Sequence, residues 1–413
     1  MEKISVENIE NWLVGLNEYN STPGVGTTRI LFTDVELAGR KYIKNLMEEI
    51  GLKVTEDSIG NIFGTLEGEE KDLPPVWTGS HIDTVNNAGM FDGMTGVIGG
   101  MEALRSIIKS GIKPKRSIQV IVFTSEEPTR FKIGCLGSRA MAGELTLEDT
   151  KKYTDDSGIS LYELLGKLGY DYDSFYKIKR NKGDVYAMVE MHVEQSEKLE
   201  QLTIPVGIVT SISAGTVIDV EILGTQEHAG ATEMSLRKDS LAGAAEIILE
   251  VEKLAKSTGR RETVATVGKL TVFPNSSNVI SGNVKLSIDM RENNFEVKEK
   301  IFNRLFELFK ELEIKRGLKI KTKVEYHDKP STSDPHIMEI IENVCNEKNI
   351  KYHKMNSGAF HDSMFVASFA PNAMIFVPSK DGVSHSKEEF TKFSEIAVGT
   401  EILRDTLLKL AME

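Results

Sequence analysis

Dense apolar runs alternate with amphipathic helical stretches over the first half of the chain. Residues 5–18, 34–50 and 94–110 carry apolar positions at helical spacing, whereas residues 117–124 (SIQVIVFT) form an apolar run rich in β-branched side chains. Such a run is typical of a central strand that is buried on both faces of a parallel sheet. Strands and helices alternating at this spacing predict an α/β domain. We also expect the polar, tyrosine-rich segment 145–181 to be helical.

The pattern changes after residue 214. A strand with alternating polarity is followed by a long helix, two strands, a second helix and a last strand: residues 217–223, 235–257, 263–273, 284–291, 295–316 and 318–326. The order β-α-β-β-α-β is that of a ferredoxin-like domain. The first pattern then resumes with a helix, two strands and a final helix: residues 335–348, 352–355, 373–377 and from 393 onward.

We therefore predict an α/β catalytic domain that is split by an insertion. Its two parts would be residues 1–210 and 330–413, and residues 211–329 would form the inserted ferredoxin-like α+β domain. The outer strand of the inserted sheet would expose unpaired backbone groups, so we expect a second copy to cover it in a homodimer. Hinges near residues 211 and 330 would let the inserted domain act as a lid over a substrate.

The composition indicates a folded protein and limits its partners. Of 413 residues, 40% are hydrophobic and 27% are charged, which supplies enough apolar material for packed cores. The formal net charge of −12 argues against nucleic acid and anionic membranes as main partners, because both repel an acidic protein. A small anionic substrate is compatible with this charge, since it responds to the local field of a cleft.

Two features of the sequence bear on its compartment. The chain has 2 cysteines, which make no disulfide framework and fit a reducing environment. Its first residues (MEKISVENIENWLVGL) have an acidic amphipathic pattern rather than the basic start and apolar block of a signal peptide. No apolar run reaches the roughly 18 residues of a membrane span. We therefore expect a cytosolic protein with no membrane segment.

Residues 77–100 (WTGSHIDTVNNAGMFDGMTGVIGG) place metal-competent side chains around a strand end and a helix start. His81 follows an apolar strand, which would hold its imidazole rigidly. Asp83 points to the same side as His81, because side chains alternate along a strand. Its carboxylate can accept the second ring N–H of a metal-bound imidazole. Asp92 then lies on a loop before a helix, where a carboxylate can bridge two ions.

Other strand ends carry similar groups. Glu126 and Glu127 follow the apolar run 117–124, His192 directly follows another apolar strand, and His385 lies in a loop after the last strand. Ligand sites of open α/β sheets form at the carboxyl ends of strands. One imidazole, one shared carboxylate and one further ligand per ion describe a two-metal hydrolytic site. Mixed nitrogen and oxygen ligands suit Zn or Mn, and the carboxylate left over would be the general base.

Eight motifs occur in one order over nearly the whole chain: GSHIDTV, FDG, FTSEEPTRF, MHVEQS, PNSSNVISG, IDMRE, SGAFHDS and IFVPSKDGVSHSKEE. Together they resemble the aminoacylase/allantoate-amidohydrolase family of dinuclear metallohydrolases. The most similar branch contains allantoate amidohydrolases, ureidoglycolate amidohydrolases, N-carbamoyl-L-amino-acid hydrolases and β-ureidopropionases. The forms EEPTRF and AFHDS point to the ureidoglycolate/allantoate subgroup. The resemblance implies a metal-dependent exopeptidase-like catalytic domain with an inserted dimerisation and lid domain.

The resemblance also implies roles for the metal-competent residues. Glu126 would be the general base, which takes a proton from the water between the ions and later gives it to the leaving nitrogen. Asp83 would support His81. Asp92 would bridge the two ions, and the assignment of the other ligands to one ion or the other stays open. These other ligands would be His81, Glu127, His192 and His385.

Substrate contacts follow from the same resemblance. Arg291 would clamp the substrate carboxylate with two parallel hydrogen bonds, which a guanidinium makes better than an ammonium. Asn278 and Gln195 would donate amide hydrogen bonds. His228 would reach the site of the partner subunit and stabilise the oxyanion of the tetrahedral intermediate. The far wall of the site would be lined by Gly358 and His361.

Two positions depart from the family pattern. MHVEQS stands where HIEQG is common, so Ser196 replaces a glycine and would narrow the pocket. HAGATEMSLRKD stands where HAGxxPM is common, and Glu233 takes the proline position. A carboxylate that faced an anionic substrate would be unfavourable. These departures therefore bear on the choice of substrate more than on the reaction.

The expected reaction is hydrolysis of a ureido or carbamoyl C–N bond next to a carboxylate, with release of ammonia. The substrate would be allantoate, ureidoglycolate or an N-carbamoyl-L-amino acid. Two alternatives stay open: a dipeptidase or N-acyl-amino-acid deacylase that uses the same metals, and a metal-bearing scaffold without activity. The presence of both Glu126 and Glu127 argues against the scaffold, because loss of function would often remove the base first.

Overall fold

A computed structural model describes all 413 residues and divides them into two compact units. The larger unit comprises Met1–Thr210, Thr332–Ser357 and His361–Glu413. The inserted unit comprises Ser211–Ser331 and Gly358–Phe360. The fold class expected from the sequence, an α/β domain with a separate inserted α+β domain, is confirmed.

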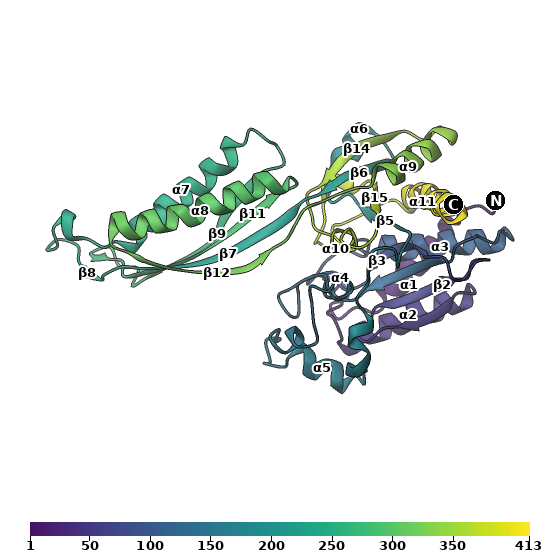
Figure 1. Ribbon diagram of the computed structural model, residues 1–413, viewed down its shortest axis with the longest axis horizontal. Coiled ribbons are helices and arrows are strands. Elements are labelled where there is room, and N and C mark those ends of the chain that lie inside the picture. Colours follow the sequence, from purple (N-terminus) through teal and green to yellow (C-terminus); the bar gives the residue numbers. More distant parts are fainter. The chain divides into compact units, whose positions relative to one another are not determined.

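A mixed sheet of 9 strands forms the centre of the larger unit (Figure 1). The strand order is β1-β2-β4-β3-β5-β15-β6-β13, and β14 pairs with β6. The strands are β1 (Lys53–Glu56), β2 (Ile62–Leu66), β3 (Val76–His81), β4 (Ile118–Phe123), β5 (Ala187–Val193), β6 (Val206–Ile212), β13 (Ser331–Thr332), β14 (Tyr352–Ser357) and β15 (Asn372–Val377).

The four strands in the middle of this sheet run in the same direction. β3 pairs in parallel with β4 and β5, and β5 pairs in parallel with β15. The neighbours β2 and β6 run antiparallel to this group. Because the carboxyl ends of parallel strands lie at one edge, the segments that follow β3, β4, β5 and β15 meet there.

Helices cover both faces of the sheet, and β4 shows why its sequence is apolar throughout. Ile118, Val120 and Val122 pack into the core on one face, whereas Ile121 and Phe123 pack into the core on the other. The first face is covered by α1 (Val6–Asn17), α2 (Asp34–Glu49), α3 (Met94–Lys109), α9 (Pro335–Glu347) and α11 (Phe393–Met412). The second face is covered by α4 (Leu136–Ala142), α5 (Leu161–Lys167) and α10 (Asp362–Val366).

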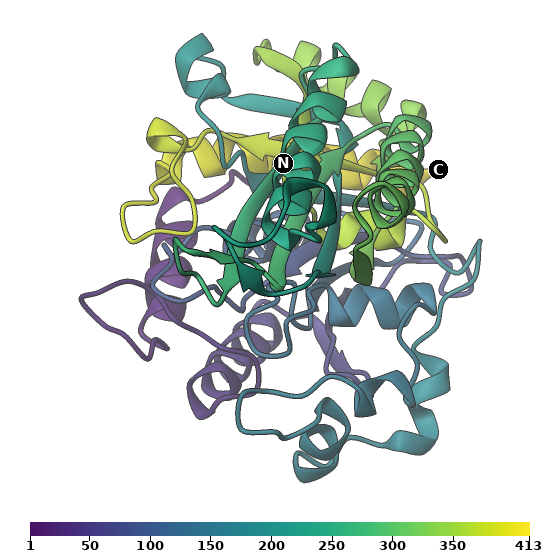
Figure 2. The ribbon, with the colours of Figure 1, turned by 90° about the vertical axis from the view of Figure 1, so that its left-hand side faces the viewer.

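The inserted unit has four long antiparallel strands in the order β12-β7-β11-β9. Its main elements are β7 (Ala214–Leu223), α7 (Ser240–Ser257), β9 (Val264–Phe273), β11 (Asn283–Glu292), α8 (Phe295–Arg316) and β12 (Lys319–His327). Both helices lie on the same face of the sheet (Figures 1 and 2). Alternate residues of β7, such as Ile218 and Val220, pack under them, while Asp219 and Glu221 point to the open face. The arrangement is ferredoxin-like, as expected.

Two expectations about local structure are wrong. The segment 145–181 is not one helical region, because only α5 is an α-helix there, beside two short 3-10 turns at Asp149–Lys151 and Tyr172–Lys177. Gly158, at a φ of 80°, interrupts helical geometry between the two 3-10 turns. The long helix α7 begins at Ser240 rather than at 235, because Asp239 caps it by accepting hydrogen bonds from Leu241 N and Ala242 N.

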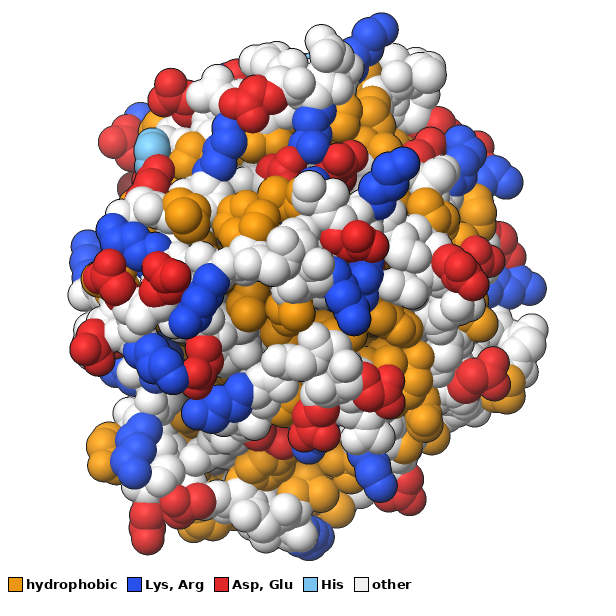
Figure 3. All heavy atoms as spheres, turned by 90° about the vertical axis from the view of Figure 1, so that its right-hand side faces the viewer, with side chains coloured by type: hydrophobic (Ala, Val, Ile, Leu, Met, Phe, Trp, Pro, Cys, Tyr) orange, Lys and Arg blue, Asp and Glu red, His pale blue; other side chains and the backbone are white.

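The remaining short elements are α6 (Lys198–Leu202), the two-residue strands β8 (Glu227–His228) and β10 (Val279–Ile280), and 3-10 turns at Met234–Leu236 and Lys380–Gly382. No helix combines the length and the apolar character that crossing a membrane requires. On the face shown in Figure 3, lysine and arginine side chains are interspersed with aspartate and glutamate. This face therefore offers no broad basic surface of the kind that nucleic acid needs.

Candidate metal centre and active site

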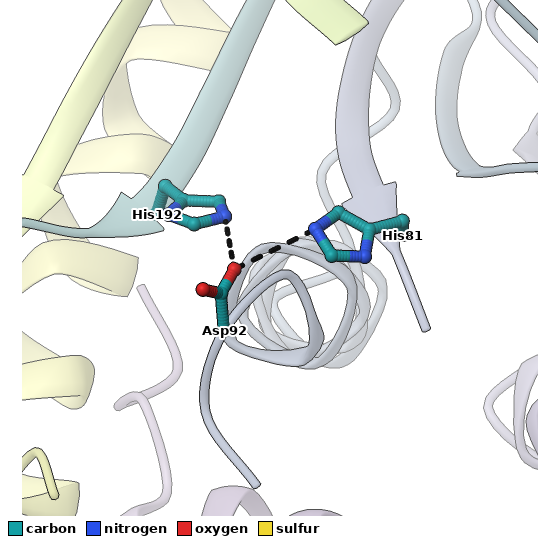
Figure 4. Close-up of side chains that lie close together, drawn as sticks. All are labelled: His81, Asp92 and His192. Atoms are coloured by element: carbon teal, nitrogen blue, oxygen red, sulfur yellow. Dashed lines mark ion pairs between the residues drawn. The ribbon is translucent and has the colours of Figure 1, made fainter. Parts of the chain in front are cut away.

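Asp92 lies between two imidazoles in the larger unit (Figure 4). Its Oδ1 is 3.1 Å from Nε2 of His192 and 3.6 Å from Nε2 of His81. The two histidines come from the ends of β5 and β3, and Asp92 lies on the loop before α3. The three side chains are buried, and their ligand atoms lie within 4.8 Å of one another. This spacing is compatible with a single metal ion.

Main-chain carbonyl groups orient both imidazoles. Nδ1 of His81 is 2.9 Å from the main-chain oxygen of Asp83, and Nδ1 of His192 is 2.9 Å from that of Val193. A carbonyl oxygen only accepts, so each Nδ1 is a donor and each Nε2 is left to face Asp92. Nε2 of His81 is buried and has no hydrogen-bond partner. A buried nitrogen that points at carboxylates without a partner of its own fits a metal ligand.

A second group shares Asp92 with the first. Nε2 of His385 is 3.2 Å from Asp92 Oδ2 and 3.2 Å from Glu127 Oε1, and these three residues also place their ligand atoms within 4.8 Å of one another. Asp92 thus offers Oδ1 to one group and Oδ2 to the other. The structure groups His192 with His81 and Glu127 with His385, a choice that the sequence left open.

The acidic and basic groups of this site shift one another's pKa. Hydrogen bonds to Asp92 and Glu127 raise the pKa of His385 to about 10. Burial would raise the pKa of Asp92, but His192 and the other two imidazoles outweigh burial and hold this pKa well below its usual range. The carboxylates of the site therefore carry negative charge that protons on the imidazoles can balance. A divalent ion would replace those protons.

Glu126 lies beside the two groups without belonging to either. Its Oε2 is 3.7 Å from Nε2 of His81, and its side chain is buried. Burial raises its pKa well above the ordinary value, although His81 opposes the shift. A carboxylate with a raised pKa holds a proton more readily than a free one does, so it can take a proton and later return it. This is the property that a general base of amide hydrolysis needs.

Asp83 connects the strand of His81 to the loop of the two glutamates. Its carboxylate accepts hydrogen bonds from the main-chain amides of Glu126, at 3.2 Å, and Glu127, at 3.1 Å. Its Oδ1 lies 3.7 Å from Nδ1 of His81, and the ring N–H donates to the main-chain oxygen of Asp83 instead. Burial raises the pKa of Asp83 to about 7. The sequence predicted that this carboxylate would accept the ring N–H of His81, but the main-chain oxygen of Asp83 takes that place and the carboxylate binds the two amides.

Two of the expected substrate residues lie in the larger unit and contact the metal-competent groups. Nε2 of Gln195 donates to Asp92 Oδ2 at 2.7 Å, and its Oε1 is buried without a partner. His361 is buried, its ring packs edge-on against His192 with centroids 4.6 Å apart, and its Nε2 is 2.9 Å from Ser357 Oγ. Burial and the neighbouring His192 hold the pKa of His361 well below its usual value, so this imidazole is neutral.

The other expected substrate residues lie in the inserted unit. His228 and Asn278 are exposed neighbours, because β8 pairs with β10 and the amide of Ala229 donates to Asn278 O at 3.0 Å. Arg291 lies on β11, where Nε is 3.3 Å from Asp289 Oδ1 and Nη1 is 3.5 Å from the main-chain oxygen of Gly358. Asp289 therefore orients a guanidinium whose side chain is still 41% exposed.

The two departures from the family pattern lie in exposed loop positions. Ser196 donates a hydrogen bond to Glu194, which also accepts from the amides of Lys198 and Leu199 at the start of α6. The hydroxyl therefore belongs to a local hydrogen-bonded loop. Glu233 is exposed and precedes a short 3-10 turn.

Two residues near the site had no signal that singled them out in the sequence. Ser384 Oγ donates to Asp92 Oδ2 at 2.8 Å, and only its place next to His385 could have indicated it. Arg29 is fully buried in a turn-rich segment without periodicity. Its guanidinium donates to the main-chain oxygens of Leu16 at 2.7 Å, Tyr19 at 2.9 Å and Ile82 at 2.8 Å. Ile82 lies between His81 and Asp83. Arg29 therefore ties α1 to the metal-competent strand end.

Comparison with known proteins gives matches over nearly the whole chain. Residues 77–409 match peptidase family M20/M25/M40. The ureidoglycolate hydrolase of Oryza sativa subsp. japonica is 37% identical over 99% of this chain and 86% of its own length. The N-carbamoyl-L-amino acid amidohydrolase of Geobacillus stearothermophilus is 38% identical, and the allantoate amidohydrolase of Bacillus subtilis (strain 168) is 34% identical, each over 99% of both chains.

The crystal structure of AtUAH in complex with glyoxylate is similar to this structure over its full length. The TM-score is 0.86 at 37% sequence identity, and the match covers 100% of this chain and 99% of that one. The similarity therefore includes the order of the strands that carry the metal-competent residues. The chain belongs to peptidase family M20/M25/M40 and is an amidohydrolase of that family.

Proposed function

We propose that this enzyme uses two divalent metal ions to cleave the C–N bond of a ureido or carbamoyl acid, with release of ammonia. The observation that supports this most is the position of Asp92, whose two carboxylate oxygens face two separate groups of side chains. His81 and His192 complete one group, and Glu127 and His385 complete the other. Two ions that share a carboxylate and a water are an arrangement common to hydrolases.

Each group would hold one ion, and mixed nitrogen and oxygen ligands suit Zn or Mn. When bound, such a pair supplies a water of lowered pKa and polarises a substrate carbonyl. Glu126 would take the proton of the attacking water, because its carboxylate lies next to His81 and belongs to neither group. The same carboxylate would then give the proton to the departing nitrogen, which would leave as ammonia or an amine.

The substrate side of the proposal rests on residues of both units. Arg291, held by Asp289, would bind the substrate carboxylate, and Asn278 and Gln195 would donate amide hydrogen bonds. His228 would stabilise the oxyanion of the tetrahedral intermediate. The wall of the site would be completed by Gly358 and His361.

Ammonia release from a panel of substrates tests the proposal. The purified enzyme with added Mn or Zn is incubated with allantoate, ureidoglycolate, several N-carbamoyl-L-amino acids, N-carbamoyl-β-alanine and a dipeptide. We expect turnover of one of the ureido or carbamoyl acids, because relatives named for these three activities match 99% of this chain. Turnover of the dipeptide alone would instead make the protein a dipeptidase. No turnover of any compound by the metal-loaded protein would support the scaffold.

Replacing Arg291 by lysine is expected to raise KM about 10- to 100-fold with little change in kcat. A lysine keeps the charge but cannot make two parallel hydrogen bonds to a carboxylate, and such charge-assisted bonds contribute about 1.5–3 kcal/mol. Steady-state kinetics on the preferred substrate measure the effect. Arg304→Lys, at a partly exposed position of α8, is the matched control and should leave KM unchanged. An unchanged KM in Arg291→Lys would contradict the carboxylate clamp.

We also propose that the enzyme is a homodimer through the inserted unit. β9 is an edge strand, and its side chains include Val264, Leu270 and Phe273, which are 52%, 46% and 64% exposed. A second copy that paired with this edge would cover them and would allow His228 to reach the partner's site. We also propose a cytosolic location, which the low count of 2 cysteines in the chain supports.

Sedimentation at micromolar concentration should therefore give twice the chain mass of 45.9 kDa. Leu270→Lys places a charge on the edge strand and is expected to yield monomers whose activity is reduced, because His228 would then lack its target site. A wild-type monomer, or a monomeric variant with full activity, would contradict the role of His228 in the partner's site.

A further inference from the structure

A fully buried carboxylate on β5, Glu190, joins three segments of the larger unit that carry candidate active-site residues. Its Oε1 accepts a hydrogen bond from Ser80 Oγ at 2.8 Å. Its Oε2 accepts two more, from the main-chain amide of Ser363 at 3.2 Å and from Ser363 Oγ at 2.6 Å. Glu190, Ser80 and Ser363 are each 0% exposed. The mechanism proposed above gives none of them a role.

Each partner in this network is a near neighbour in sequence of a residue of the site. Ser80 precedes His81 at the end of β3, and Glu190 lies on the same side of β5 as His192, because the two are separated by one residue. Ser363 lies in α10, directly after the loop that carries His361. The three hydrogen bonds of Glu190 therefore set the spacing of the segments from which these three imidazoles project.

A second buried carboxylate, Asp362, extends the network toward the general base. Ser138 Oγ donates to Asp362 Oδ1. Ser138 lies in α4, and the amides at the start of this helix bind the loop of the glutamates: Cys135 N donates to Glu126 O and Leu136 N to Ser125 O, both at 3.0 Å. Burial, together with the charge of Glu190, raises the pKa of Asp362 to about 8.

We propose that Glu190 and Asp362 are positioning residues, which hold β3, β5, α10 and α4 in the register that makes His81, His192, His361 and Glu126 converge. The inference rests on the metal site proposed above and names what keeps its geometry. A buried carboxylate is costly, and a well-packed apolar residue would stabilise a sheet as well or better. Both oxygens of Glu190 accept hydrogen bonds, whereas Asp362 uses only Oδ1 and its Oδ2 is buried without a partner. Hydrogen bonds give directions that apolar contacts do not, and metal ligands need positions held within about 0.5 Å.

Glu190→Gln is the first test, because glutamine keeps the shape of glutamate. The amide of Ser363 requires an acceptor, so the glutamine oxygen must face Ser363 and its NH2 group must face Ser80, whose hydroxyl can turn to accept. We expect a folded protein whose affinity for Zn or Mn is about 10- to 100-fold lower in competition with a chelator, although the five ligands proposed above are intact. In the kinetics of the metal-saturated variant, kcat should fall more than KM rises.

Ser80→Ala is a milder second variant, which removes a single hydrogen bond on the β3 side. It should weaken the ion held by His81 and His192 and leave the ion held by Glu127 and His385 unchanged. Glu102→Gln is the matched control, because Glu102 is a buried carboxylate of α3 that binds Ser5 N at 2.7 Å, away from these segments. This control should lower the melting temperature without changing metal affinity.

The outcomes separate the two proposals. Wild-type affinity for both ions in Glu190→Gln and Ser80→Ala, or a loss no larger than that of Glu102→Gln, would overturn the positioning role. A wild-type protein that binds no pair of divalent ions would overturn the metal site itself, whatever the variants do. Selective loss of the ion beside His81 in both variants would support the positioning role.

Discussion

Replacing Glu126 by glutamine is expected to lower kcat by about 10³-fold while the metal content stays unchanged. General acid–base catalysis contributes about 10²- to 10⁴-fold, and Glu126 would serve both as base and as acid in one turnover. A glutamine has nearly the same shape but cannot take the proton of the attacking water. A 10³-fold loss corresponds to about 4 kcal/mol of barrier. Ammonia release and elemental analysis of the metal measure the two quantities.

Glu102→Gln is the control for this variant as well, because it places the same amide in a buried position of the same unit. It should retain nearly full activity per folded molecule. The role of Glu126 as the base would be wrong if Glu126→Gln kept more than a tenth of the wild-type kcat. Loss of metal together with activity would instead make Glu126 a ligand, which its place outside the groups of metal-competent side chains does not indicate.

Asp92→Asn is expected to abolish the pair of ions and to lower activity by about 10⁴-fold or more. Both groups depend on this carboxylate, since Oδ1 faces His81 and His192 and Oδ2 faces His385. An amide has no charge, and only one of its two ends can coordinate a cation. Elemental analysis at a metal concentration that saturates the wild type should therefore find fewer than one ion per chain. Circular dichroism would verify that the variant is folded.

His385→Gln is the matched comparison, because His385 belongs to only one of the two groups and its side chain is 49% exposed. This variant should keep the ion held by His81 and His192 and lose the other. Equal metal content in Asp92→Asn and His385→Gln would contradict a carboxylate shared between two ions. Wild-type activity in Asp92→Asn would contradict the metal mechanism as a whole.

Local sequence patterns predicted the order of elements well where the patterns were strong. The β-α-β-β-α-β order of the inserted unit follows from alternating strands such as β11 and from amphipathic helices such as α8, which begins at Phe295 as expected. Weak patterns failed. The segment 145–181 has polar residues at many positions without helical spacing, and Asp239 determines the start of α7 through a cap that hydrophobic spacing does not show.

In the candidate site, too, local sequence patterns predicted some features and not others. Metal-competent residues directly after apolar strands could be recognised one by one, and the family motifs indicated which of them to combine. Their grouping could not be recognised, because it depends on which strands are neighbours. β3 lies between β4 and β5, and β15 lies beside β5 although their sequences are far apart. Only that order brings Glu127 to His385 and His192 to His81.

By itself, the sequence determined the two kinds of unit and the residues that can carry chemistry, because periodicity and residue type are local properties of the chain. The tertiary structure alone decided which side chains group at each oxygen of Asp92 and that Asp83 binds the amides of Glu126 and Glu127. It also decided that Arg29 and Glu190 are buried partners of the site. These contacts join residues distant in sequence, and their distances depend on strand order and packing, which no local pattern records.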